Sequence, residues 1–223
     1  MGIGIWSMHF IGMLAFSVPI PLRYNVLVTL ASLAIAVLTS GFALGIAGRR
    51  DLSLSRLAVG SVIMGAGICA MHYTGMAALR GPFILTWDSN YVAASIVLGA
   101  ALAALAVFLS RSIRGLSGAI ASAAALTLAI VAMHFTAMTA ATLVMAPVVD
   151  SGAAILDPSS LAIAVAAVGI LIITLGLTGA QLDSHLTILK EREEDRLRQH
   201  ISELEATQAH LAATLAEAEA ANA

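Results

Sequence analysis

The chain repeats one short motif in which histidine lies beside methionine. The three copies read MHFIGM at 8–13, MHYTGM at 71–76 and MHFTAM at 133–138. Neutral imidazole binds copper, iron or zinc, and the thioether of methionine is a soft ligand that prefers Cu(I). A single copy would be explained by a hydrogen-bonded histidine and by methionine as core filler. Three copies instead favour metal ligation.

Helical geometry places the chemically active side chains of each copy on one face. At 100° per residue, His72 and the methionines at both ends of its motif fall within an arc of about 140°. Gly75 lies inside this arc, and the third copy has Ala137 there. A small residue lets helices approach closely, which leaves room for an imidazole or an ion.

The composition is that of an integral membrane protein. Of the 223 residues, 60% are hydrophobic and 11% are charged, and the mean hydropathy is +0.96. The net charge of −2 says little about partners. Because no basic patch is present, we expect no nucleic-acid partner, and the lipid bilayer is the main partner that the composition predicts. Apolar runs of about 20 residues can cross a membrane as helices. We expect six such spans, at 2–18, 25–48, 57–79, 91–110, 117–146 and 159–180.

The single cysteine, Cys69, excludes an internal disulfide. It lies three residues before His72, on the same arc, but its counterparts in the other copies are Trp6 and Val131. We therefore expect a structural role for this thiol.

The spacing of the copies predicts three parallel two-helix repeats. The interval from His9 to His72 is 63 residues, and that from His72 to His134 is 62. Each interval accommodates two membrane crossings, so every motif lies on a helix of the same direction. Internal repeats of this kind often carry sites at their interfaces. We expect the three histidines to share one layer of the bilayer.

Arginine distribution predicts the orientation. Alternate loops hold five arginines on one side of the membrane, Arg49, Arg50, Arg56, Arg111 and Arg114, against Arg23 and Arg80 on the other. By the positive-inside rule, the C-terminus is cytoplasmic, and Met1 lies on the same side. The first span begins at the chain start, and we expect the sequence to be a fragment at both ends.

These motifs resemble the MHYT domain, a bacterial integral-membrane sensor domain named after Met-His-Tyr-Thr, which residues 71–74 spell literally. The resemblance covers about residues 1–180 and implies a bacterial inner-membrane protein. It also implies copper binding, through which O₂, CO, NO or the metal itself would be sensed. The ligands implied are His9, His72, His134, Met8, Met13, Met71, Met76, Met133 and Met138.

Residues 181–223 differ sharply from the rest, because they are rich in Ala, Leu, Glu and Gln and lack Gly and Pro. Leu182, Leu186 and Leu189 follow the 4-3 spacing of a coiled coil, which resumes after a phase slip at Ile201, Leu204, Leu211 and Leu215. We expect an all-α protein with two domains, a transmembrane domain at 1–180 and a cytoplasmic coiled-coil helix at 181–223. The apolar stripe that this spacing creates predicts a homodimer in which the tail helices of two chains pair.

Four functions remain open on the sequence: a copper-dependent sensor, a metal transporter, a haem protein with two axial histidines, and a structural bundle that dimerises an output domain. Ligands at one depth fit a transporter poorly, and three equivalent histidines fit haem poorly. The sequence contains no P-loop, nucleophile elbow, kinase or cyclase signature. We therefore expect no enzyme activity here, and any kinase, cyclase or phosphodiesterase would lie in a missing C-terminal module.

Overall fold

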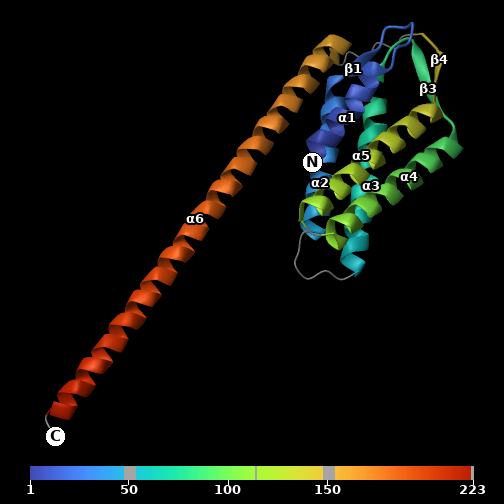
Figure 1. Cartoon of the computed structure of the whole chain (residues 1–223). Helices are drawn as coiled ribbons and strands as arrows, with labels where there is room; N and C mark the ends of the chain where they lie inside the picture. Colours follow the sequence, from blue (N-terminus) through green and yellow to red (C-terminus); the bar gives the residue numbers. More distant parts are fainter. Residues whose placement is uncertain (48–53, 114, 148–153, 222–223) are drawn as a thin grey trace. The chain divides into compact units, whose positions relative to one another are not determined.

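The structure is a computed structural model that describes residues 1–47, 54–113, 115–147 and 154–221. Within these residues it is dominated by six helices, as the sequence predicts (Figure 1). They are α1 (Gly2–Ala15), α2 (Val26–Ala47), α3 (Leu54–Ala77), α4 (Ser89–Ser112), α5 (Gly115–Ala140) and α6 (Pro158–Ala221). The motifs lie on α1, α3 and α5, the first helix of each repeat.

Short strands occupy the connections that follow the motif helices, where the sequence interpretation expected loops and, at 141–146, the end of a helix. They are β1 (Arg23–Asn25), β2 (Leu79–Arg80), β3 (Phe83–Trp87), β4 (Ala141–Met145) and β5 (Ile155–Leu156). The helix expected over 117–146 is therefore wrong at its end, since α5 stops at Ala140. Thr142 and Val144 of β4 pair with Thr86 and Ile84 of β3. Such β-branched cross-strand pairs stabilise a strand better than a helix.

The strands join the three repeats at one end of the bundle. β1 is central in a three-stranded antiparallel sheet of order β2-β1-β5, and Tyr24 pairs with both Leu79 and Leu156. β1 follows α1, β2 follows α3, and β5 lies in the connection after α5, so the motif helices all end on the same side. We call this two-sheet region the strand cap. It confirms that the repeats are parallel.

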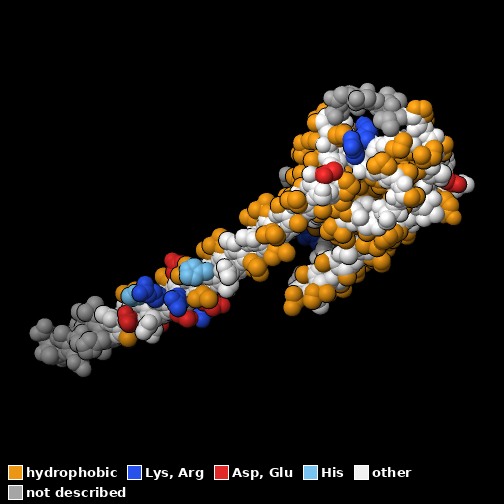
Figure 2. All heavy atoms as spheres, turned by 90° about the horizontal axis from the view of Figure 1, so that it is seen from above, with side chains coloured by type: hydrophobic (Ala, Val, Ile, Leu, Met, Phe, Trp, Pro, Cys, Tyr) orange, Lys and Arg blue, Asp and Glu red, His pale blue; other side chains and the backbone are white. Residues whose placement is uncertain are grey.

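Residues Met1–Ile172 form one compact unit. In it α1, α3 and α5 contact one another, α2 packs on α3, and α4 packs on both α3 and α5. Many outward side chains are apolar, such as Leu27 and Leu116, each 76% exposed, and hydrophobic atoms cover much of the face seen in Figure 2. An apolar exterior of this extent is the surface that lipid requires.

Five of the described helices, α2 to α6, are long and apolar enough to cross a membrane. α1 is shorter, with 14 residues, or about 21 Å at 1.5 Å per residue, against a hydrocarbon core of about 30 Å. The chain is therefore a multi-pass membrane protein in which the first motif lies on the shortest helix.

Residues Ile173–Ala223 form the second unit, which is the continuation of α6. Every side chain described between 181 and 208 is exposed, including His185 and His200. One uninterrupted helix confirms the expected continuation of the last span into the tail. The tail side chains His210, Leu211 and Leu215, and the loop residues Arg49, Arg50, Arg114 and Asp150, lie outside what the structure describes.

Candidate metal centre

The three motif histidines meet in the interior of the first unit. His9, His72 and His134 are 1%, 0% and 5% exposed. Their Nδ1 atoms form a triangle, with edges of 3.1 Å between His72 and His9, 3.3 Å between His9 and His134, and 3.3 Å between His134 and His72. The three rings therefore share one layer of the bundle, which the repeat spacing predicts.

Neutral imidazoles cannot satisfy all three edges of this triangle by hydrogen bonds. A hydrogen bond between two Nδ1 atoms needs one protonated and one unprotonated nitrogen. Among three nitrogens, at least two must be alike, so at least one edge joins two donors or two acceptors. A cation at the centre would instead accept all three Nδ1 lone pairs at once.

The triangle has the size of a metal site. With edges of 3.1–3.3 Å, its centre lies about 1.9 Å from each nitrogen, close to the metal–imidazole bond of about 2.0 Å known for zinc. Among the His, Cys, Asp and Glu side chains that the structure describes, these three form the group that could hold an ion. Three imidazoles suit copper, zinc or iron.

The small residues of the motif make room for the rings, as their position on the helical arc predicts. A Cβ atom added at Gly12 would lie 2.5 Å from Nε2 of His134, and one added at Gly75 would overlap Nε2 of His9. Each of these glycines thus packs against the imidazole of another repeat. Ala137, at the same position of the third motif, is fully buried.

The outer nitrogens of two rings are buried without a partner. Nε2 of His9 and Nε2 of His72 make no hydrogen bond to any part of the chain that the structure describes. A buried polar atom without a partner costs about 1–3 kcal/mol. Such atoms are rare in native proteins and are typical of functional sites or of sites for an ion or water.

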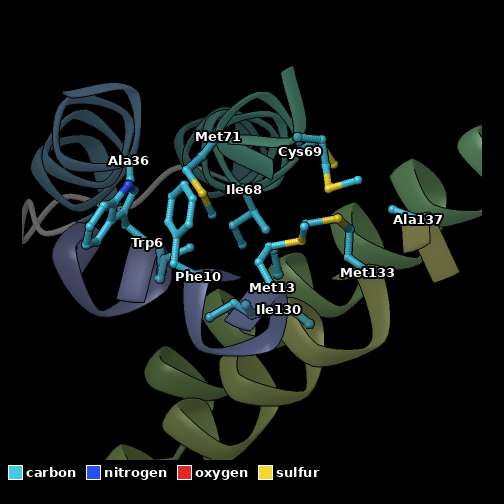
Figure 3. Packing of buried hydrophobic residues seen from close by; sticks show 14 of the residues in the cluster. Trp6, Phe10, Met13, Ala36, Ile68, Cys69, Met71, Ile130, Met133 and Ala137 are labelled. Atoms are coloured by element: carbon cyan, nitrogen blue, oxygen red, sulfur yellow. The ribbon is translucent and has the colours of Figure 1, made fainter. Parts of the chain in front are cut away.

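Isoleucine completes the repeated motif, and the sequence interpretation missed it. Ile5, Ile68 and Ile130 each lie four residues before a motif histidine, so the repeat reads Ile-x-x-Met-His. All three are buried, at 3%, 1% and 4% exposure, and Figure 3 shows Ile68 and Ile130 directed into the same space between the helices. Residues four apart share a helix face. The isoleucines therefore form a layer one helical turn from the histidines, on the side away from the strand cap. Aligning the three copies over a longer stretch would have found it.

The methionines surround the histidine layer at several heights. Met13, Met71, Met76 and Met133 are buried, whereas Met8 and Met138 are partly buried. Met13 and Met76 line cavities at the strand cap. Met8 lines a cavity on the opposite side of the layer.

Cys69 is buried in the same apolar cluster as these methionines (Figure 3). A Cβ atom added at Gly99 of α4 would lie 2.9 Å from Cγ of Met133 and 3.7 Å from Sγ of Cys69. Cys69 therefore faces α4, beside Met133. This position agrees with the structural role expected for it.

Aromatic side chains connect the layer to its surroundings. The ring of Tyr73 packs edge-on against His72 at a centroid distance of 5.1 Å and against Trp87 of β3 at 5.2 Å. The hydroxyl groups of Tyr73 and of Ser95 on α4 are hydrogen-bonded at 2.7 Å. Tyr73 thus links the histidine layer to α4 and to the strand cap.

Comparison with known proteins agrees with the three repeats. The family described as "Bacterial signalling protein N terminal repeat", MHYT, matches residues 2–60, 65–126 and 128–186. Each segment contains one motif and all or part of the helix after it, so the matches are centred on α1–α2, α3–α4 and α5–α6, with borders that fall inside α3 and α5. No solved structure is significantly similar to the chain.

Several bacterial signalling proteins are similar to this chain. The bifunctional diguanylate cyclase/cyclic di-GMP phosphodiesterase MucR of Pseudomonas aeruginosa is 41% identical over 83% of the chain and 28% of its own length. The cyclic di-GMP phosphodiesterase NbdA of the same organism is 40% identical over 63% of the chain and 19% of its length. The signaling protein YkoW of Bacillus subtilis is 33% identical over 64% of the chain and 18% of its length. The chain thus spans less than a third of each relative. It belongs to the MHYT family and is a membrane sensor region of the kind found in bacterial signalling proteins.

Proposed function

We propose that this chain is a copper-dependent sensor in which Nδ1 of His9, His72 and His134 holds one copper ion. The observation that carries the proposal is the buried Nδ1 triangle, with edges of 3.1–3.3 Å. A central cation would satisfy all three nitrogens at once, and the centre of the triangle is at about metal-bond distance from each of them.

Copper fits the surroundings better than zinc does. Zinc in proteins is almost always four-coordinate, and the triangle supplies three nitrogens in a site with little access to water. Thioethers favour Cu(I). The buried Met13, Met71 and Met133 all belong to the hydrophobic core cluster of the first unit. We keep the six motif methionines as candidate additional ligands.

Haem is a poorer fit. An iron between two axial imidazoles separates their nitrogens by about twice the metal–nitrogen bond of about 2 Å, with the macrocycle between them. The three Nδ1 atoms here lie within 3.3 Å of one another. That spacing leaves no room for a porphyrin between any two of the rings.

A metal held by three ligands keeps a coordination position for a further molecule, which is the chemistry that copper would supply here. O₂, CO or NO would bind there, or occupancy by copper itself would be the signal. For signalling, the two states of the bundle must bind the ligand with different affinities. The chain's own residues provide the connection, because the histidine layer contacts the strand cap through Tyr73 and Trp87.

We propose that the signal leaves through α6. β5, immediately before this helix, pairs with β1 in the strand cap, and α6 runs without a break from Pro158 to Ala221. The similarity to MucR, a diguanylate cyclase/phosphodiesterase, and to NbdA, a cyclic di-GMP phosphodiesterase, supports an output that makes or degrades cyclic di-GMP. That activity would belong to a segment outside these 223 residues, on the cytoplasmic side of the bacterial inner membrane.

The copper content of the purified protein tests this function. We expect about one copper ion per chain in the wild type, and its loss in His72→Ala and in His134→Ala, because each removes one of the three imidazoles. His185→Ala serves as the matched control, since this histidine is exposed in the tail. Helicity and size-exclusion profiles verify that the variants fold. Equal copper in the wild type and in the folded His72 and His134 variants would refute the ligand assignment.

A metal transporter is the alternative of a different class. A transport path requires ligands at several depths and a route between them. The motif methionines lie at other heights, but the three histidines share one layer, and the buried isoleucines beside it offer an ion no ligand. Copper uptake into proteoliposomes above the rate of empty vesicles would support the transporter and contradict the sensor.

A further inference from the structure

A cavity of about 310 Å³ lies on the side of the isoleucine layer that faces away from the strand cap. Five helices contribute to its wall: Gly4 and Met8 come from α1, Leu44 from α2, Met64 from α3, Ala106 from α4 and Leu126 from α5. Its size exceeds the apolar cavity of about 150 Å³ that stays dry and binds xenon or benzene in another protein.

The wall of this cavity is apolar even where it carries hydroxyl groups. Ser110 and Ser122 line it, but their hydroxyls donate to the carbonyl oxygens of Val107 and Ala119 on their own helices. A ligand in the cavity therefore meets mainly hydrocarbon and sulfur, besides the hydroxyl of Thr127. Such a wall favours a neutral apolar molecule over an ion or a hydrogen-bonding solute.

The cavity reaches the histidine layer through the isoleucines. Ile5 and Ile130 line it, and each lies one helical turn, about 6 Å, from His9 or His134 on the same helix face. The Nδ1 triangle lies on the other side of these isoleucines from the cavity. Two side chains thus belong both to the wall of the cavity and to the floor of the candidate metal centre.

We propose that this cavity and the isoleucine layer form the entry path by which a small neutral gas molecule reaches the histidine cluster. That the gas binds a metal at the histidine cluster rests on the function proposed above, whereas the existence of the cavity does not. Side-chain rotation of Ile5 and Ile130 would pass a diatomic molecule. A hydrated ion would lose its water at this apolar constriction, as in pores that close by dewetting. The path therefore admits the ligand and retains the metal.

Filling the cavity tests the path. A Cβ atom added at Gly4 meets nothing within 4 Å, so Gly4→Leu projects a side chain into the cavity without a backbone clash. Gly45→Leu is the matched control, because Gly45 on α2 also has open space and does not line the cavity.

The first measurement uses xenon and the metal-free protein, with ¹³C-labelled isoleucine methyls and histidine rings followed by NMR. We expect saturable xenon-induced shifts at Ile5, Ile130 and His134 in the wild type and in Gly45→Leu, and their loss in Gly4→Leu. The path is refuted if xenon shifts neither isoleucine, as a permanently bound acyl chain would cause, or if Gly4→Leu responds like the control.

The second measurement follows CO binding to the Cu(I)-loaded protein after photolysis. We expect Gly4→Leu to slow CO association at least fivefold with unchanged copper content, and Ile130→Ala to accelerate it, while Gly45→Leu matches the wild type. Equal rates in all proteins would overturn the path and leave the copper site standing. A wild type without copper would overturn the proposed function, and the xenon measurement would still decide whether the cavity leads to the histidines.

Discussion

At the scale of residues, the candidate site depends on contacts between repeats. Each imidazole points its Nδ1 at the other two rings, and the Nε2 atoms of His134 and His9 abut Gly12 and Gly75 of different helices. The glycine of one repeat therefore positions the histidine of another. Because protein interiors are close-packed, even one added methyl group must displace a ring.

Gly75→Ala tests this arrangement. Its Cβ atom would overlap Nε2 of His9, so the ring must rotate or α1 must move away from α3, and Nδ1 leaves the triangle. We expect copper affinity to fall about 10-fold or more, as for other changes to residues that orient metal ligands. Gly41→Ala is the control, since a Cβ atom there meets nothing within 4 Å. If both variants bind copper with wild-type affinity in competitive chelator titrations, glycine is not needed to position the ring.

At the scale of elements, α1 is the least independent part of the bundle. It has 14 residues, too few to span the hydrocarbon core, and it carries one of the three histidines. A buried hydrogen bond of 3.1 Å from Nε1 of Trp6 to Oγ of Ser32 joins it to α2. The Ser32 hydroxyl in turn donates to the Thr29 carbonyl at 2.7 Å. This polar link fixes the rotation of α1 and therefore the direction of His9.

Ser32→Ala would leave the indole N–H of Trp6 buried without an acceptor. We expect the free energy of unfolding to fall by about 1 kcal/mol, which is the usual size of such a loss. Hydrogen bonds between helices of membrane bundles contribute somewhat less on average. Reversible unfolding in mixed micelles provides the measurement. Thr178→Ala is the control, because that exposed hydroxyl bonds only to the Thr174 carbonyl of its own helix. A loss no larger than that of the control would show that the link does not hold α1.

At the scale of the whole molecule, the tail of α6 has an apolar seam with no partner in the described chain. Leu182, Leu186 and Leu189 are 58%, 48% and 45% exposed, and they follow the 4-3 spacing of a coiled coil. A single polar helix is marginally stable in water. A second copy of the chain is the partner that we propose for this seam, with both tails in the cytoplasm.

One cysteine variant tests both the dimer and the orientation. In membranes, Leu186→Cys should cross-link to a second copy under a permeant oxidant, because seam residues of a parallel pair face each other. Ser184→Cys, on the opposite face of the helix, should cross-link at least fivefold less, and buried Cys69 should not interfere. In intact cells an impermeant maleimide should label neither variant until the membrane is opened. Equal cross-linking at both positions would contradict the seam, and labelling of intact cells would reverse the orientation.

Residue type and spacing sufficed to predict six helices, though not where α5 ends, together with the three parallel repeats and the meeting of the histidines in one layer. Those features follow from local rules: apolar length determines which helices span a membrane, and an interval of two crossings determines which helices are parallel. Gly75 was predicted to leave room for an imidazole for the same reason, since its place on the helical arc depends on the sequence alone.

Only the tertiary structure decided which groups face each other. The strand cap arises because β4 pairs with β3 and because β1 pairs with both β2 and β5. The repeat spacing does not specify which glycine packs on which ring. Likewise, Nδ1 rather than Nε2 points to the centre, and Met8 lines a cavity while Met13 lies toward the strand cap. These outcomes depend on helix rotation and on side-chain rotamers, which are determined by packing between segments far apart in the chain.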